Sequence, residues 1–130
     1  MNVSYVYDAG ALIAIDSKDK RMWLIHQTAL AEGREIIIPA IVVGQAWRDG
    51  RKQARLARFL RTCQVEPIDL ETAKAAGLLC GQAGSSDVVD ATVMVTAQAH
   101  HANIVTSDHK DMTELAKACR ARPTPVVIRA

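Results

Sequence analysis

The stretch Val3-Ser4-Tyr5-Val6-Tyr7-Asp8 decides the fold of this chain. It is rich in β-branched and aromatic residues and ends on a carboxylate, so it predicts a buried strand with Asp8 at its C-terminal tip. In an open α/β sheet, ligands bind in the crevice at the carboxyl ends of the strands. This strand therefore points a candidate functional residue at the place where such a sheet carries its chemistry.

Two further acidic segments are expected beside it. Asn103-Ile104-Val105-Thr106-Ser107 is a short apolar run that ends on Asp108, and Asp87 and Asp90 occupy the first turn of a long apolar helical pattern. We expect Asp8, Asp90 and Asp108 to converge on a divalent metal. Carboxylate oxygens suit Mg²⁺, and such an ion lowers the pKa of water and neutralises charge on a phosphoryl group, which suits phosphodiester hydrolysis.

Helix capping is the competing interpretation of the same aspartates. Asp8 and Asp108 each precede an expected helix, and Asp90 suits the third position of its own helix, where the helix dipole favours negative charge without any metal. For Asp87 the capping role is favoured over ligation. Thr106 and Ser107 either hold waters near the metal or cap the next helix.

Strands alternate with helices along the whole chain. The pattern predicts further strands at 35–39, 65–68, 103–107 and 125–128. It predicts helices at 51–63, from Asp69 to about Cys80 and at 87–101, and a last helix that follows Asp108 and ends at about Arg120. Pro67 places the 65–68 strand at a sheet edge. The alternation predicts a mostly parallel α/β sheet with helices on both faces, in one domain over residues 1–130.

Composition excludes several classes of protein. The 130 residues are 49% hydrophobic, as in an ordinary globular domain. The net charge of +2 is too small to indicate a class of binding partner. Cys63, Cys80 and Cys119 have no C-x-x-C spacing, which fits a reducing compartment and not a thiolate zinc site. No signal peptide or membrane-length apolar segment is apparent, so we expect a cytoplasmic protein with no membrane partner.

Four segments together resemble a known family. They are Asp8-Ala-Gly-Ala-Leu-Ile-Ala, Ile-Pro-Ala with its helix, Asp87-Val-Val-Asp90-Ala and Val-Thr-Ser-Asp108-His-Lys-Asp111. Their order and spacing over nearly the whole chain resemble the PIN domain, in particular VapC-type toxins of bacterial toxin–antitoxin pairs. The resemblance implies a Rossmann-like three-layer sandwich with a sheet of four to five strands, and an endoribonuclease dependent on Mg²⁺ or Mn²⁺. It also implies a homodimer that is inhibited by a cognate antitoxin.

The resemblance assigns roles residue by residue. Asp8, Asp90 and Asp108 match the first, third and fourth metal acids, as catalytic and metal-binding residues, and Asp111 matches a further acid three positions on. The second acid falls at Gln45, which adds no charge and cannot act as a base. Either metal affinity falls, or Asp87 or Asp49 must compensate, although Asp49-Gly50 reads more simply as a turn.

A run of cations follows this turn: Arg48, Arg51, Lys52, Arg55, Arg58 and Arg61. It could track an RNA backbone or dock an acidic antitoxin segment, and a solvated helical face is the ordinary alternative. The leading function is an RNA endonuclease of the toxin type. The alternative, motivated by Gln45, is a catalytically weakened PIN module that binds RNA or a protein without cutting. An aspartyl phosphatase is disfavoured because Gly10 stands where its second acid would be.

Overall fold

The computed structural model describes residues 2–119 and 124–130. Five strands form one sheet in the order β3-β2-β1-β4-β5, and every neighbouring pair is parallel. The elements are β1 Tyr5–Tyr7, α1 Ala9–Asp16, α2 Lys20–Ala31, β2 Ile36–Pro39, α3 Ala40–Ala46, α4 Ala54–Leu60, β3 Gln64–Glu66, α5 Leu70–Ala83, α6 Val88–Ala99, β4 Asn103–Thr106, α7 His109–Ala118 and β5 Val127–Arg129.

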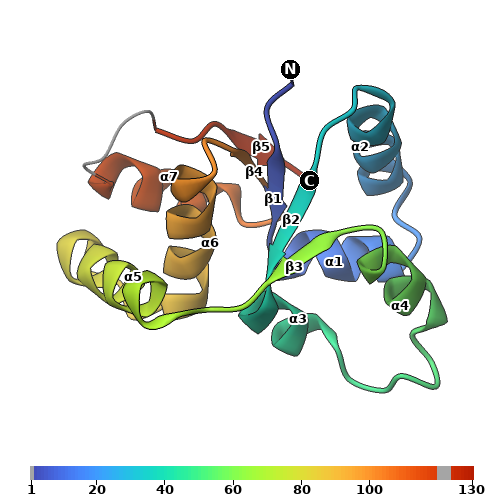
Figure 1. Cartoon of the computed structure of the whole chain (residues 1–130), viewed down its shortest axis with the longest axis horizontal. Helices are drawn as coiled ribbons and strands as arrows, with labels where there is room; N and C mark the ends of the chain where they lie inside the picture. The colour runs from blue at the N-terminus through green and yellow to red at the C-terminus, as the bar shows by residue number, and fades with distance from the viewer. Residues whose placement is uncertain (1, 120–123) are drawn as a thin grey trace.

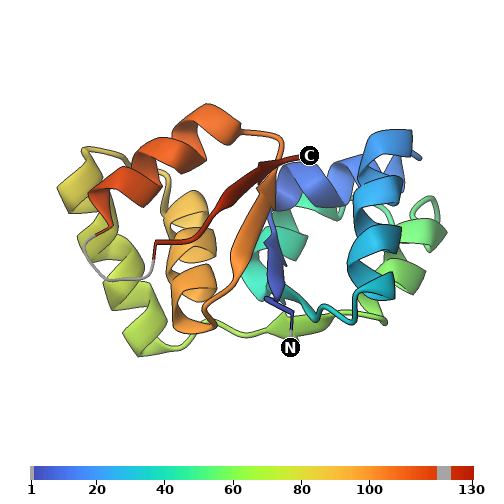
Figure 2. The same ribbon diagram turned by 90° about the horizontal axis from the view of Figure 1, so that it is seen from above.

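Helices cover both faces of the sheet, so the expected three-layer sandwich is confirmed. Seen from above, α1, α2 and α4 lie on one side of the strands and α5, α6 and α7 lie on the other (Figure 2). Helix α3 follows directly after β2 and contacts both α1 and α6. The first strand lies between β2 and β4, at the centre of the sheet, and β3 lies at an edge as Pro67 predicted.

The core is made by the central strands and by α6. Ile37, Ile38 and Ile104 are fully or almost fully buried, as expected for strands that are covered on both faces. The apolar surroundings of α6 bury Val93 and Met94 completely. Among the described residues, no helix combines the length and apolar character that crossing a membrane requires.

Local signals explain most helix boundaries. Asp8, Asp19, Asp69 and Asp108 each accept a hydrogen bond at the start of a helix. The glycine stop of α5 is Gly84, with φ +67°, so the helix runs on to Ala83 and our expected end near Cys80 was wrong. Helix α7 ends at Ala118, and Arg120 lies outside the described residues.

One expectation on the α2–α4 side is corrected. The amphipathic segment 51–63 is helical only over Ala54–Leu60, because residues 47–53 form a loop around the side chain of Gln53. On the same side, His26 of α2 is buried, with Nδ1 3.0 Å from the hydroxyl of Tyr7 and its ring centroid 4.7 Å from that of Phe59. Burial lowers the pKa of His26 because the charged imidazolium loses its hydration.

Candidate active site

Asp8 is a buried carboxylate at the carboxyl end of the central strand. Its side chain is only 4% exposed, and Oδ1 accepts the N–H of Ala11 at 2.9 Å, which caps α1. Burial raises the pKa of Asp8, although hydrogen bonds from Thr106, Ala11 and the backbone of Ser107 oppose that rise. Asp8 is therefore both a helix cap and a carboxylate held in place at the carboxyl end of the sheet.

Thr106 links Asp8 to Asp108. Strand β4 lies beside β1 with Tyr7 opposite Val105, so the next residues, Asp8 and Thr106, emerge side by side. The fully buried hydroxyl of Thr106 donates to Oδ2 of Asp8 and accepts the N–H of Asp108 at 2.9 Å. The Thr106 hydroxyl thus fixes both the carboxylate of Asp8 and the start of the segment that carries Asp108.

The close approach of α1 to this segment depends on Gly10. A Cβ atom at position 10 would lie 1.7 Å from Oγ of Ser107 and 2.7 Å from its Cβ. Only a residue without a side chain allows the first turn of α1 to pack against the β4–α7 connection. The absence of a second acid at this position, noted in the sequence, thus has a steric reason in this fold.

Asp90 interacts electrostatically with Asp87, Asp8 and Asp108. Its pKa is raised to about 7 by burial first, then by Asp87, with further repulsion from Asp8 and Asp108. Asp87 caps α6, as its favoured interpretation predicted, with Oδ1 accepting the N–H of Asp90 at 3.0 Å. Carboxylates from β1, α6 and the β4–α7 connection therefore share one electrostatic environment.

Asp108 and Asp111 extend the acidic group along α7. Oδ1 of Asp108 accepts the N–H of Asp111 at 3.4 Å, and the pKa of Asp108 is raised by partial burial first and then by repulsion from Asp111. A pocket of about 340 Å³ runs between α6 and α7 and is lined by Asp87, Asp90, Asp111 and Glu114. Sequence reasoning missed Glu114, although its i, i+3 spacing from Asp111 places both side chains on one helix face.

The donor set of this acidic cluster (Asp8, Asp87, Asp90, Asp108 and Asp111) fits a hard divalent cation. Carboxylate oxygens are the ligands that Mg²⁺ prefers. A cation would also relieve the repulsion that adds to burial in raising the pKa values of Asp8, Asp90 and Asp108. Among the described residues, no three His, Cys, Asp or Glu side chains are grouped closely enough, as they stand, to hold a metal ion. The ligand set itself stays a prediction.

Gln45 is exposed on α3, the helix that follows β2 and contacts α6, which carries Asp90. The carboxylate of Asp49 is paired with Arg51. The Asp49 carboxylate lies 3.2 Å from Nε of Arg51 and accepts the backbone N–H of Arg51 at 3.0 Å, and these bonds lower the pKa of Asp49. It stabilises the turn, as the simpler interpretation predicted.

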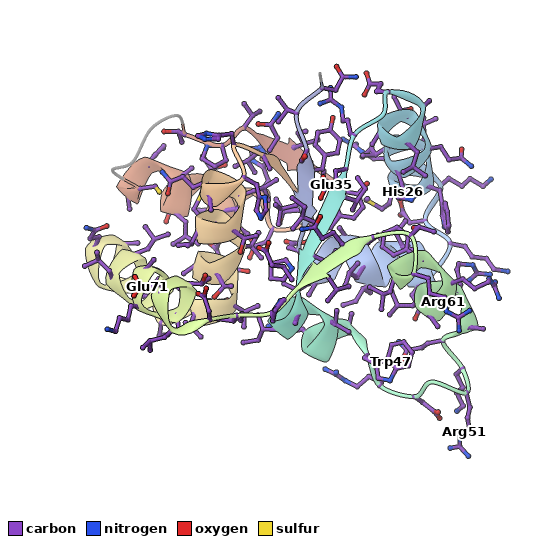
Figure 3. The ribbon with its side chains drawn as sticks, viewed as in Figure 1. His26, Glu35, Trp47, Arg51, Arg61 and Glu71 are labelled. Carbon is purple, nitrogen blue, oxygen red and sulfur yellow. The ribbon has the colours of Figure 1, made fainter. Side chains whose placement is uncertain are left out.

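The basic run divides into anchored and exposed cations. Nη1 of Arg48 donates to the carbonyls of Gly44 and Trp47 at 3.0 and 2.7 Å, so Arg48 caps the end of α3. Nη1 of Arg55 donates to the carbonyl of Asp16 at 3.0 Å. Arg51 and Lys52 are exposed in the loop that joins α3 to α4, and Figure 3 shows Arg51 projecting from its tip.

Solved structures share this fold over nearly the whole chain. VapBC2 from Rickettsia felis, bound to a promoter DNA fragment, superposes with a TM-score of 0.71 at 18% identity and covers 97% of this chain and 98% of that chain. A toxin–antitoxin complex from Klebsiella pneumoniae gives 0.70 at 21% identity, covering 95% and 96%. DNA-bound VapBC from Salmonella typhimurium gives 0.68 at 15% identity, covering 98% of each chain.

Sequence comparison agrees with the structural one. No curated protein matched the sequence. The sequence model of the PIN domain, however, matches residues 5–118, which begin at β1 and end with α7, and so include the whole acidic cluster. This protein is a member of the PIN domain family.

Proposed function

We propose that this protein is a metal-dependent endoribonuclease of the VapC type, the toxin of a toxin–antitoxin pair. The observation that carries the proposal is the gathering of acids from β1, α6 and the β4–α7 connection, whose mutual repulsion adds to burial in raising the pKa values of Asp8, Asp90 and Asp108. Membership of a nuclease-type family and the fold shared with VapBC complexes support it.

Asp8, Asp90 and Asp108 are the residues that would hold Mg²⁺ or Mn²⁺, with Asp87 and Asp111 as further ligands. When bound, such a cation lowers the pKa of water and neutralises the charge that develops on a phosphoryl group. Asp8 is fixed for this role by Thr106 and Ala11. Without a cation, burial and repulsion from Asp87, Asp8 and Asp108 raise the pKa of Asp90 to about 7, and a bound cation would favour its charged form.

RNA cleavage tests the proposal directly. We expect the wild-type chain to cut single-stranded RNA with Mg²⁺ or Mn²⁺ and to lose this activity in EDTA. Asp8→Asn should reduce the rate at least a hundredfold, on the order of a removed catalytic group. Glu71→Gln, which changes an exposed acid on α5, serves as the charge-matched control. Cleavage that survives EDTA, or that persists at full rate in Asp8→Asn, would remove the metal mechanism.

An antitoxin is the proposed protein partner. A groove of about 420 Å³ between α2 and α4 combines apolar walls, including Trp23, Leu30 and Phe59, with Arg55 and Arg58. A segment that is both apolar and acidic would complement this surface. Expression of the wild type in a bacterium should arrest growth, Asp8→Asn should not, and the antitoxin should restore growth.

We place this activity in the cytoplasm, where cellular RNA is available, and propose a homodimer as the active assembly. Light scattering of the purified protein at assay concentration tests the dimer. A monomeric mass under conditions where RNA is cut would refute it.

The alternative is a PIN module that binds RNA or a protein without cutting, and Gln45 favours it. A glutamine adds no negative charge, so metal affinity should be weaker than with glutamate at this position. Calorimetric titration with Mn²⁺ discriminates, because absence of saturable binding at millimolar metal supports the binding module. Gln45→Glu should then tighten metal binding and raise the cleavage rate if position 45 is the weak point.

A further inference from the structure

Gln53 organises the loop that precedes α4. Its side chain is buried, and Oε1 accepts the N–H groups of Arg48 at 2.7 Å and Asp49 at 2.9 Å. Nε2 donates to the carbonyl of Ala46 at 2.9 Å and to Oδ2 of Asp16 at 3.1 Å. Every donor of this amide and both lone pairs of its oxygen are used, so the loop is folded around one side chain.

The same amide ties the loop to α1, and α1 leads back to the acidic cluster. Asp8 caps the beginning of this helix and Asp16 is its last residue. At 1.5 Å per residue, the two positions are about 12 Å apart along the helix axis. The guanidinium of Arg55 adds a second tie, at 3.0 Å from the Asp16 carbonyl. The loop is therefore held at a fixed distance from the acids by a single rigid element.

Helix α1 runs from the carboxyl end of β1 towards α4 and the loop before it (Figure 1). Residues 48–61 contain six cations and one carboxylate, Asp49, which is paired with Arg51. The side chain of Arg51 is 91% exposed, and Arg61 lies on the same side of the molecule (Figure 3). One end of α1 thus carries clustered acids and the other carries a surface with an excess of cations.

We infer that the Gln53-anchored loop, residues 47–53, is a preformed phosphate-binding arm for single-stranded RNA, with Gln53 as its positioning residue. The inference rests on the proposed function. With a rise of about 3.4 Å per nucleotide in a stacked strand, the length of α1 corresponds to roughly three to four nucleotides. Because the loop lies beyond Asp16, Arg51 and Lys52 receive backbone phosphates at least that many nucleotides from the bond that is cut, on one side of it only.

Binding measured in EDTA tests the arm without requiring catalysis. The variants are Arg51→Ala/Lys52→Ala and the charge-matched control Lys74→Ala/Lys117→Ala, whose lysines are exposed on α5 and α7. Fluorescence anisotropy with a labelled single-stranded oligoribonucleotide gives the dependence of log affinity on log salt. Loss of two phosphate contacts should reduce that slope by about 1.4 in the arm variant, and the control should keep the wild-type slope.

A double-mutant cycle tests the role of Gln53. Gln53→Ala leaves the cations in place but frees the loop, so RNA affinity should fall by roughly three- to tenfold. In the Arg51→Ala/Lys52→Ala background the same change should have little further effect. A merely structural role would weaken binding equally in both backgrounds and would overturn the positioning role. Gln82→Ala, at an exposed glutamine on α5, is the control.

A scan with single neutral methylphosphonates uses only surface variants, so it stays decisive if Gln53→Ala does not fold. With Mn²⁺, neutralising one phosphate at least three to four nucleotides from the cut, on one side of it, should slow the wild type and leave Arg51→Ala/Lys52→Ala unaffected. Equal effects in both proteins would overturn the arm, as would an unchanged salt slope or an effect on antitoxin binding alone. If the wild type cuts no RNA while the arm variant still lowers the salt slope, the nuclease proposal fails and the arm stands.

Discussion

Replacing Asp90 by asparagine should stabilise the metal-free protein near neutral pH. Asp90 is half-buried, and repulsion from Asp87, Asp8 and Asp108 adds to burial in raising its pKa to about 7. Asparagine keeps the size of the side chain and removes the ionisable group. The substitution therefore relieves the repulsion that a bound cation would otherwise relieve, so the free energy of unfolding should rise.

The magnitude follows from the pKa. A rise from 3.8 to about 7 corresponds to roughly 4 kcal/mol, and solvent screening of a half-buried group reduces this to about 2 kcal/mol. Loss of a favourable charge in the first turn of α6 costs roughly 0.5 kcal/mol of stability, so the free energy of unfolding should rise by about 1–2 kcal/mol in total. For a chain of this size, that gain is a rise in Tm of roughly 3–8 °C.

The gain should depend on pH with a defined sign. Because the folded-state pKa of Asp90 is raised, its contribution to stability is fully present below the unfolded value of 3.8 and is lost as the pH rises through about 7. Asp90→Asn does not suffer this loss. The two proteins should therefore differ most at about pH 8 and converge near about pH 4.

Urea unfolding in EDTA at both pH values is the assay, with Glu71→Gln as a control that should lose only the roughly 0.5 kcal/mol of a first-turn charge. Millimolar Mn²⁺ should then stabilise the wild type more than Asp90→Asn, because binding to the folded state adds to stability. An Asp90→Asn protein that unfolds at the same or lower urea than the wild type at about pH 8 would refute the proposed repulsion.

Two further predictions concern the support of the acidic cluster. Thr106→Val removes the hydroxyl that joins Asp8 to the Asp108 segment and should reduce the free energy of unfolding by about 2–4 kcal/mol. Thr106→Ser keeps the hydroxyl and should reduce it by about 1 kcal/mol. Equal losses in urea unfolding would contradict the bridging role of the hydroxyl. Gly10→Ala forces a Cβ against Ser107 and should destabilise by roughly 1–3 kcal/mol, whereas Gly77→Ala, a helix position with open space, should be neutral or stabilising in the same thermal melts.

Much of the fold could be predicted because its signals are local. The apolar runs that end at Asp8 and Asp108 identify buried strands, because strand periodicity and its bounding polar residues act over a few positions. Segment 51–63 could not be assigned correctly from its amphipathic spacing. Its first residues are held out of the helix because Oε1 of Gln53 accepts hydrogen bonds from the backbone N–H groups of Arg48 and Asp49, and no local pattern reports those bonds.

The candidate site divides in the same way. The sequence by itself determined that aspartates stand at strand tips and helix starts, since strand periodicity and capping act over a few residues. Only the tertiary structure decided that β4 lies beside β1, so that Thr106 meets Asp8, Asp90 shares their field and Glu114 faces the same pocket. Electrostatic repulsion and hydrogen bonding act through space, and the order of strands in the sheet sets which distant residues become neighbours.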